Sequence, residues 1–250
     1  MRRKGKAYLV GAGPGSPDLL TIRARSVLER AEVVLYDQLA GGVRDLLPKG
    51  AELIDCGKSG SSHTMEQAEI ERILVKKALE GKRVVRLKGG DPFLFGRGGE
   101  ELEALRAAGV AVELVPGVTS AIAVPGCVGI PVTHRSHASE VVILTGHEDP
   151  DKEESSIDWE ILAKFRGTIV ILMGVKNLSA IASRLVARGK DPETPVAIIE
   201  RGLDAGQRVT TGPLGEIGET GRKAGVRPPA VIVIGGVVGL YREEDLCGAT

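Results

Sequence analysis

The sequence has 250 residues, of which 42% are hydrophobic and 26% charged, a balance typical of a globular protein with one large domain or two compact ones. Lysine and arginine number 33 together, as do aspartate and glutamate, so the chain has no net positive charge that would attract nucleic acid. The three cysteines are too few and too scattered for a disulfide framework, which favours a reducing cytoplasm. No secretory signal follows Met1, and the longest apolar and glycine-rich run, 230–241, is far shorter than the ~20 residues that span a bilayer. We therefore expect a soluble protein without a membrane partner.

In the first half of the chain, short β-branched runs alternate with helix-length amphipathic stretches. Strands are predicted at 7–10, 32–36, 83–87 and 110–115, and helices at 19–30, 65–80 and 98–108. In the last of these helices Leu102, Leu105 and Ala108 share one face, whereas Glu101, Glu103 and Arg106 lie elsewhere. Such alternation is typical of parallel strands joined by crossover helices.

The pattern changes near Pro116. After a glycine- and proline-rich stretch that reaches Pro131, longer polar segments separate strands predicted at 140–145, 168–173, 195–200 and 230–235. A short alternating run at 207–211 indicates an additional antiparallel strand. We therefore expect two α/β domains, an N-terminal one over 1–116 and a C-terminal one over 117–250.

The most informative motif is GGDPFLFGRGGEE, at 89–101, directly after a strongly hydrophobic predicted strand. That position is the carboxyl edge of the expected sheet, where open α/β sheets bind ligands. Gly89 and Gly90 carry no side chain, so backbone groups can approach a ligand closely. A structural turn would account for the glycines and the proline, but not for Phe93, Phe95 and Arg97 beside them. We interpret this stretch as a ligand-binding loop.

Three other possible sites, for a dinucleotide, a phosphate and a metal, each lack a residue that such a site needs. The segment 11–16 begins like a dinucleotide-binding fingerprint, but Ser16 occupies the third glycine position. A phosphate-binding loop ending at Lys58 would need a glycine where the chain has Glu52. His134 and His137 have no carboxylate at ligand spacing, so no metal site is predicted. No GxSxG string supports a hydrolase.

Several segments resemble the tetrapyrrole methyltransferase family, in the family's order and over nearly the whole chain, and in particular its members that act on uroporphyrinogen III. They are VGAGPGSPDLLT (10–21), VLYDQL (34–39), GKRVVRLKGGDPFLFGRGGEE (81–101), VPGVTSA (115–121), GIPVTHR (129–135) and LMG (172–174). One departure is GPGSPD, where many members have an acid directly after GPG, and Asp18 can fill that role. The resemblance implies a parallel N-terminal sheet, a mixed C-terminal sheet, a cofactor cleft between the two α/β domains, and a homodimer.

The resemblance also implies the cofactor and its contacts. The cofactor is S-adenosyl-L-methionine, which leaves as S-adenosyl-L-homocysteine. The implied contacts are Pro14, Gly89, Gly90, Asp91, Leu94, Thr119, Ser120, Met173, Gly202 and Ala230. Asp37 matches the position of the proton acceptor and Lys58 that of the proton donor.

The implied reaction methylates uroporphyrinogen III twice and gives precorrin-2 through precorrin-1, for siroheme, cobalamin or another tetrapyrrole. This substrate is rich in carboxylates, which cations at the site can hold: Arg86, Lys88, Arg97, His134 and Arg135. Asp37 can either accept a proton or stabilise the cation formed first, and both roles stay open. Larger siroheme synthases carry an N-terminal dehydrogenase and ferrochelatase part, which we do not expect here because the first predicted strand begins close to Met1.

Three alternatives also stay open. The chain could methylate a later corrin intermediate, or it could be a non-catalytic module that binds a tetrapyrrole or nucleotide. The retention of Asp37 and Lys58 argues against the second of these. A nicotinamide-dependent oxidoreductase is the third alternative, and the residue at position 16 argues against it.

Overall fold

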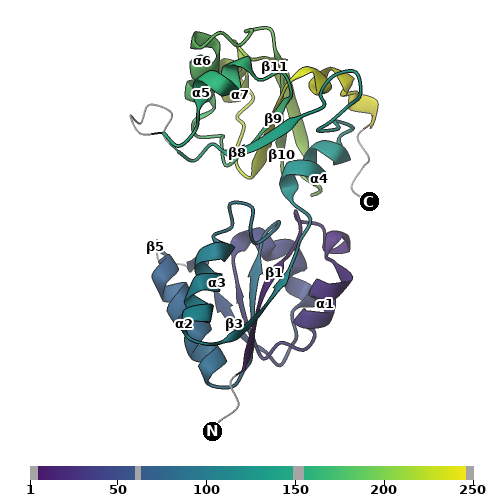
Figure 1. Ribbon diagram of the computed structural model, residues 1–250. Coiled ribbons are helices and arrows are strands. Elements are labelled where there is room, and N and C mark those ends of the chain that lie inside the picture. The colour runs from purple at the N-terminus through teal and green to yellow at the C-terminus, as the bar shows by residue number, and fades with distance from the viewer. Residues whose placement is uncertain (1–4, 60–62, 149–154, 246–250) are drawn as a thin grey trace. The chain divides into compact units, whose positions relative to one another are not determined.

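The computed structural model describes residues 5–59, 63–148 and 155–245, with the backbone alone at 38–41, 58, 59, 63, 64 and 245. The chain divides into two compact units, Met1–Thr119 and Ser120–Thr250, each built around a five-stranded sheet (Figure 1). The first sheet is entirely parallel and the second is mixed. The predicted fold class, with a parallel N-terminal sheet and a mixed C-terminal sheet, is confirmed.

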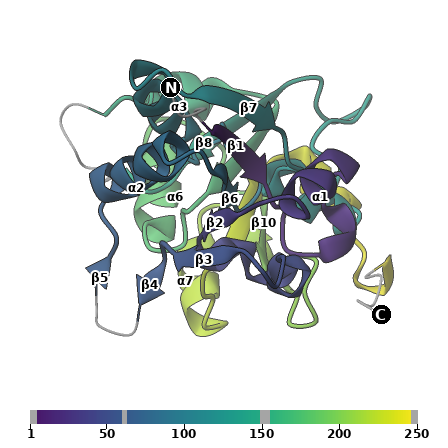
Figure 2. The same cartoon turned by 90° about the horizontal axis from the view of Figure 1, so that it is seen from below.

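The sheet of the first unit has the strand order β3-β2-β6-β1-β7. Its strands are β1 (Lys6–Gly11), β2 (Val33–Tyr36), β3 (Glu52–Asp55), β6 (Arg83–Lys88) and β7 (Ala111–Val115). One face is covered by α1 (Ile22–Leu28) and by the 3-10 segment η2 (Gln38–Leu46), and the other by α2 (Gln67–Leu79) and α3 (Gly98–Ala107) (Figure 2). Side chains of β1 alternate between these faces, with Leu9 packing toward α2 and Val10 toward α1.

Two features of the first unit differ from the sequence prediction. Helix α1 starts at Ile22 and not near residue 19, because Pro17–Leu19 forms the separate 3-10 turn η1. The Thr21 hydroxyl caps the helix by accepting a hydrogen bond from the Ala24 amide at 3.1 Å. The sequence did not predict strand β3, nor the small two-stranded sheet formed by β4 (Lys58–Ser59) and β5 (His63–Thr64). Strands this short carry only a weak hydrophobic pattern.

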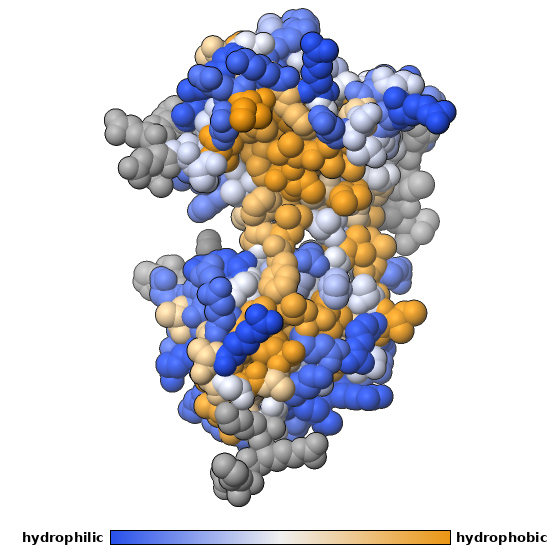
Figure 3. Space-filling view, in the orientation of Figure 1, coloured by the Kyte–Doolittle hydropathy of each residue, from blue (hydrophilic) through white to orange (hydrophobic). Residues whose placement is uncertain are grey.

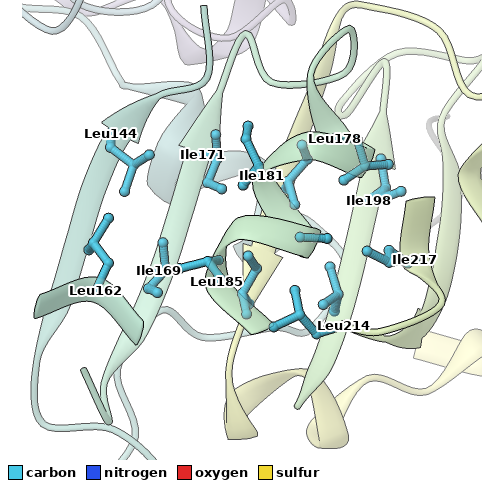
Figure 4. Close-up of a cluster of buried hydrophobic side chains, with 14 of the residues drawn as sticks. Leu144, Leu162, Ile169, Ile171, Leu178, Ile181, Leu185, Ile198, Leu214 and Ile217 are labelled. Atoms are coloured by element: carbon cyan, nitrogen blue, oxygen red, sulfur yellow. The ribbon is translucent and has the colours of Figure 1, made fainter. Parts of the chain in front are cut away.

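The sheet of the second unit has the strand order β11-β10-β12-β9-β8. Its strands are β8 (Val141–Thr145), β9 (Thr168–Leu172), β10 (Pro195–Glu200), β11 (Arg208–Pro213) and β12 (Ala230–Ile234). Three helices cover one face, α5 (Trp159–Lys164), α6 (Leu178–Ala187) and α7 (Ile217–Lys223). Figure 4 shows the core beneath them, a single cluster that includes Leu144 and Ile171 of the sheet and Ile181 and Leu185 of α6. Helix α4 (Ser120–Cys127) and the 3-10 segment η3 (Gly236–Leu240) pack against the same sheet, and η4 (Glu243–Asp245) follows.

Strand β11 pairs antiparallel with β10, so the additional antiparallel strand predicted from sequence is confirmed. Helix α4, in contrast, lies in the stretch that the sequence marks only as rich in glycine and proline. Pro125 lies inside this helix and lacks the amide that would continue the hydrogen-bond ladder. Ala121 and Val124 are buried, and their packing offsets the lost hydrogen bond.

Exposed hydrophobic side chains occur in both units (Figure 3). They include Ile22 and Leu114 in the first unit, and Ile122, Val141 and Ile161 in the second. Leu114 and Val141 lie on β7 and β8, each at the end of its sheet. Single exposed apolar residues of this kind are normal on a protein surface. Every helix among the described residues is too short or too polar to cross a bilayer.

A carboxylate on β7 ties the edge of the first sheet to two other elements. Glu113 accepts hydrogen bonds from Lys6 of β1, at 2.5 Å, and from Nε of Arg23 of α1, at 2.7 Å. These bonds, first that of Lys6 and then that of Arg23, hold the pKa of Glu113 below its ordinary value of 4.5. Ionised Glu113 therefore stabilises the folded chain.

We expect Glu113→Gln to lower the free energy of unfolding by roughly 1 kcal/mol at neutral pH, the size of two partly exposed ion pairs. Because the pKa of Glu113 is lower in the folded state, its ion pairs contribute fully to the free energy of unfolding above pH 4.5. This contribution is lost as the pH falls through the folded-state pKa. Urea unfolding of both proteins at stepwise lower pH should thus show the difference shrinking below 4.5. A difference that is independent of pH would contradict this account. Glu103→Gln, at an exposed position of α3, serves as control and should leave the free energy of unfolding nearly unchanged.

Candidate active site

The loops that follow β1 and β6 are joined at the carboxyl edge of the first sheet. The Ala12 amide donates to the Lys88 carbonyl at 2.7 Å, directly beyond the strands. One step further, the Gly90 amide donates to the Gly13 carbonyl at 2.7 Å, and the Gly13 amide donates to the Gly90 carbonyl at 3.2 Å. The predicted binding loop is therefore paired with the glycine-rich turn of 11–16, at the edge where open α/β sheets bind ligands.

Three glycines bring the end of β1 into backbone contact with the loops after β6 and β7. A Cβ atom on Gly117 would lie 2.1 Å from the Gly90 carbonyl oxygen and 2.7 Å from the Cα of Gly11. A Cβ on Gly11 would lie 2.5 Å from the Gly90 oxygen and from the Cα of Gly117. Only glycine fits at positions 11 and 117, because these neighbours are backbone atoms that no rotamer change can move. We call Gly11, Gly90 and Gly117 the glycine junction.

Asp91 holds the glycine junction closed. One oxygen of its carboxylate accepts the Phe93 amide at 2.8 Å, and the other accepts the Gly117 amide at 3.1 Å. The side chain thus links the loop after β6 to the loop after β7. Both carboxylate oxygens accept backbone amides, so Asp91 fixes the two loops at the sheet edge relative to each other.

The other predicted cofactor contacts of the first unit follow the same strands. Pro14 comes after β1, Leu94 after β6, and Thr119 after β7. Phe95 and Arg97, in the loop with Leu94, adopt left-handed φ angles of 53° and 57°. Such angles are uncommon for bulky residues and cluster at ligand-binding loops. The structure therefore brings the predicted contacts of this unit to one sheet edge.

A group of four charged residues lies beneath this edge. Arg86 and Lys88 are each only 4% exposed, and the Glu101 carboxylate in the first turn of α3 is fully buried between them. Glu101 Oε1 accepts from Arg86 Nε at 3.0 Å and from Lys88 Nζ at 2.8 Å. On its other side, Arg86 Nη2 lies 3.6 Å from Asp37 Oδ2. Burial, followed by the charge of Arg86, lowers the pKa of Lys88.

The sequence prediction that Glu101 lies away from the apolar face of its helix is wrong, because Glu101 is fully buried. This arrangement also differs from the expectation that Arg86 and Lys88 present their charges to a substrate, since both are buried and paired with Glu101. Arg97 is exposed and forms an ion pair with Glu100 at 2.6 Å. The backbone of Lys58 lies in β4, but its side chain is outside the described residues.

In the second unit, Met173, Gly202 and Ala230 lie at one edge of the mixed sheet. Ala230 pairs with Glu200 at the end of β10, and its neighbour Val231 pairs with Leu172 at the end of β9. Met173 has a left-handed φ of 57° and is exposed. Gly202 is packed against α4, since a Cβ there would lie 2.4 Å from a methyl group of Val124. Ser120 is the first residue of the same helix.

His134 and Arg135 lie in a turn between α4 and β8. The His134 amide donates to the Ala138 carbonyl at 2.8 Å, and its ring lies 4.9 Å, centroid to centroid, from that of His137. Arg135 is exposed. No group of three or more histidine, cysteine, aspartate or glutamate side chains within the described ranges is arranged to hold a metal ion.

Comparison with known proteins identifies the family. The sequence pattern described as "Tetrapyrrole (Corrin/Porphyrin) Methylases" matches residues 6–218. The chain belongs to the tetrapyrrole methylase family. The S-adenosyl-L-methionine-dependent uroporphyrinogen III methyltransferase of Methanosarcina barkeri is 59% identical over 238 residues, which cover 95% of this methylase and 93% of that protein.

Two further relatives differ in the share of their own length that the match covers. Siroheme synthase 1 of Pectobacterium atrosepticum is 49% identical over 248 residues, and the match covers 99% of this methylase and 51% of that protein. The chain thus spans about half the length of that relative. The uroporphyrin-III C-methyltransferase of Thermus thermophilus, solved with S-adenosyl homocysteine, is 41% identical with a TM-score of 0.81, and the match covers 95% of this methylase and all of that chain.

Sequence reasoning missed four residues that shape the site of this methylase: Gly11, Gly117, Glu101 and Val124. Glu101 precedes the buried Leu105 by one helical turn, so the spacing already placed it on the buried face. Arg86 and Lys88 likewise alternate with Val85 and Leu87 along β6, which places them together on the α3 side of the sheet. The contacts of the glycines and of Val124 carry no such signal, because they join segments far apart in the sequence.

Proposed function

We propose that this protein transfers methyl groups from S-adenosyl-L-methionine to two ring carbons of uroporphyrinogen III, giving precorrin-2 through precorrin-1. The observation that carries the proposal is the glycine junction, which joins the end of β1 to the loops after β6 and β7 at the carboxyl edge of the first sheet, through backbone atoms alone. The M. barkeri and T. thermophilus relatives support both the cofactor and the substrate.

The residues at the two sheet edges fit such a cofactor. Backbone groups and small side chains predominate among Pro14, Gly89, Gly90, Asp91, Leu94 and Thr119 of the first unit and Ser120, Met173, Gly202 and Ala230 of the second, and we propose that these residues bind it. When bound, S-adenosyl-L-methionine supplies a methyl group already activated on its sulfonium. The task left to the protein is to hold the acceptor carbon in line with that methyl group, which needs rigid positioning more than acid or base groups.

The charged residues serve the tetrapyrrole. We propose that Arg97, His134 and Arg135 hold its carboxylates, since an arginine binds a carboxylate through two hydrogen bonds. Asp37, whose side chain is 27% exposed, accepts the proton that the macrocycle loses or stabilises the positive charge that forms first. Lys58 remains our proposal for the proton donor.

Arg86 and Lys88 are buried, so we assign them to the support of Asp37 and not to the substrate. We also propose a homodimer in the cytoplasm.

The test of this function is incubation of the protein with uroporphyrinogen III and a methyl-labelled donor. Mass spectrometry should show a product with two added methyl groups. Parallel incubation with a later corrin intermediate should leave that compound unchanged. Methylation of the later intermediate alone would assign the protein to another step, and binding of uroporphyrinogen III without methyl transfer would make it a non-catalytic module.

A further inference from the structure

Four charged residues of the first unit, three buried and one half-buried, form a continuous row. Lys88 contacts Glu101, Glu101 contacts Arg86, and Arg86 faces Asp37, over distances of 2.8, 3.0 and 3.6 Å between the charged atoms. The row begins beneath α3 and ends at the carboxyl edge of β2, where Asp37 is partly exposed. Two positive and two negative groups alternate along it, so each charge has a neighbour of opposite sign.

Stability alone does not account for this row. Arg86, Lys88 and Glu101 are almost wholly removed from water, which is costly for a charged group, and well-packed hydrophobic residues often stabilise an interior equally well. Glu101 is moreover only half satisfied. Its Oε1 accepts hydrogen bonds from both cations, and from Gln67 Nε2 at 3.4 Å. The buried Oε2 has no hydrogen-bond partner among the described residues. A carboxylate placed at such cost points to a role that a hydrophobic residue could not fill.

The geometry points to Glu101 as a positioning residue that fixes the guanidinium of Arg86 against Asp37. This inference rests on the proposed function, because it takes Asp37 as the residue that acts on the tetrapyrrole. Arg86 reaches Glu101 with Nε and faces Asp37 with Nη2. Since the guanidinium is planar and rigid, holding one end of it determines where the other end lies.

Glu101 itself does not contact a substrate. No part of the residue is exposed, and Leu105, one turn further along α3, is equally buried. Arg86 is nearly as inaccessible, with 5% of its side chain exposed, and its Nη1 donates to the Leu87 carbonyl at 3.1 Å. Of the four groups, only Asp37 has substantial exposure. Any effect of Glu101 on the reaction must therefore pass through Arg86 and Asp37.

A double-mutant cycle tests this connection. Glu101→Gln keeps the shape of the side chain but removes the charge that holds Arg86, and we expect kcat to fall about tenfold with little change in the affinity for S-adenosylmethionine. In an Asp37→Asn background the same substitution should change kcat less than about twofold, because the residue it positions is already inactive. Glu103→Gln, the same change on an exposed position of α3, should leave kcat unchanged.

A purely structural role predicts a different result, in which Glu101→Gln lowers kcat by the same factor with or without Asp37. That outcome, or wild-type kcat in Glu101→Gln, overturns the inference. If Glu101→Gln does not fold, Arg86→Lys carries the same test, since lysine keeps the charge but cannot reach both carboxylates through one rigid fork. Its loss of kcat should likewise vanish with Asp37→Asn. Wild-type protein that binds the donor but does not methylate uroporphyrinogen III would instead refute the proposed function.

Discussion

Gly117→Ala is expected to weaken the binding of S-adenosylmethionine by about a hundredfold or more, because a displacement near 1 Å at a positioning site has an effect of that size. The added Cβ would lie 2.1 Å from the Gly90 carbonyl oxygen, and neither atom can move without its own backbone. Either the loop after β7 or the loop after β6 must therefore move. Movement of either loop also stretches the 3.1 Å hydrogen bond between the Gly117 amide and Asp91.

Gly50→Ala is the matched control for this variant. Gly50 is exposed in the turn before β3, and a Cβ there meets nothing within 4 Å. Alanine at this position should leave both folding and the binding of S-adenosylmethionine unchanged. Calorimetric titration with S-adenosylmethionine measures the affinity, and circular dichroism reports whether each variant is folded. A folded Gly117→Ala protein with wild-type affinity would remove the glycine junction from the cofactor site.

The alternation of strands and helices could be predicted from sequence because it depends on local periodicity. Leu105 and Leu102 on α3, or the hydrophobic run in β6, are visible without knowledge of any partner. Helix α4 could not be predicted in the same way. Pro125 argues against a helix locally, and only the burial of Ala121 and Val124 in the second unit outweighs it. That packing partner lies beyond any local window of sequence.

The candidate site was predictable to a different degree. The binding loop at 89–101 could be recognised from its glycines and its place after β6, although residue-level roles within it could not. The contact of Gly117 with Gly90 depends on how two loops meet across the sheet edge. The pairing of Arg86 and Lys88 with Glu101 depends on how α3 lies over β6. The alternation along β6 places both charges on one face of the sheet, but their pairing with Glu101 depends on the helix that covers that face.

Asp37→Asn is expected to lower kcat by about a hundredfold or more, the usual contribution of a group that takes or stabilises a proton in the transition state. Asparagine has the shape of aspartate but can neither accept the proton nor oppose a developing positive charge. The affinity for S-adenosylmethionine should stay within about twofold of the wild-type value, because Asp37 follows β2 and has no part in the glycine junction. Turnover with uroporphyrinogen III and calorimetry with the donor measure the two effects separately.

The neighbouring strand offers a control for this variant. Asp55 ends β3 directly beside Tyr36 of β2, and its carboxylate accepts the Gly57 amide at 2.8 Å. The side-chain oxygen of an asparagine could accept the same bond, so Asp55→Asn should leave kcat unchanged. Asp37→Asn should itself stay folded, because Arg86 keeps its bond to Glu101 after the Asp37 charge is gone. A loss of donor affinity that matched the loss of kcat would show that Asp37 binds the cofactor, and the assignment of the proton to this carboxylate would then be wrong.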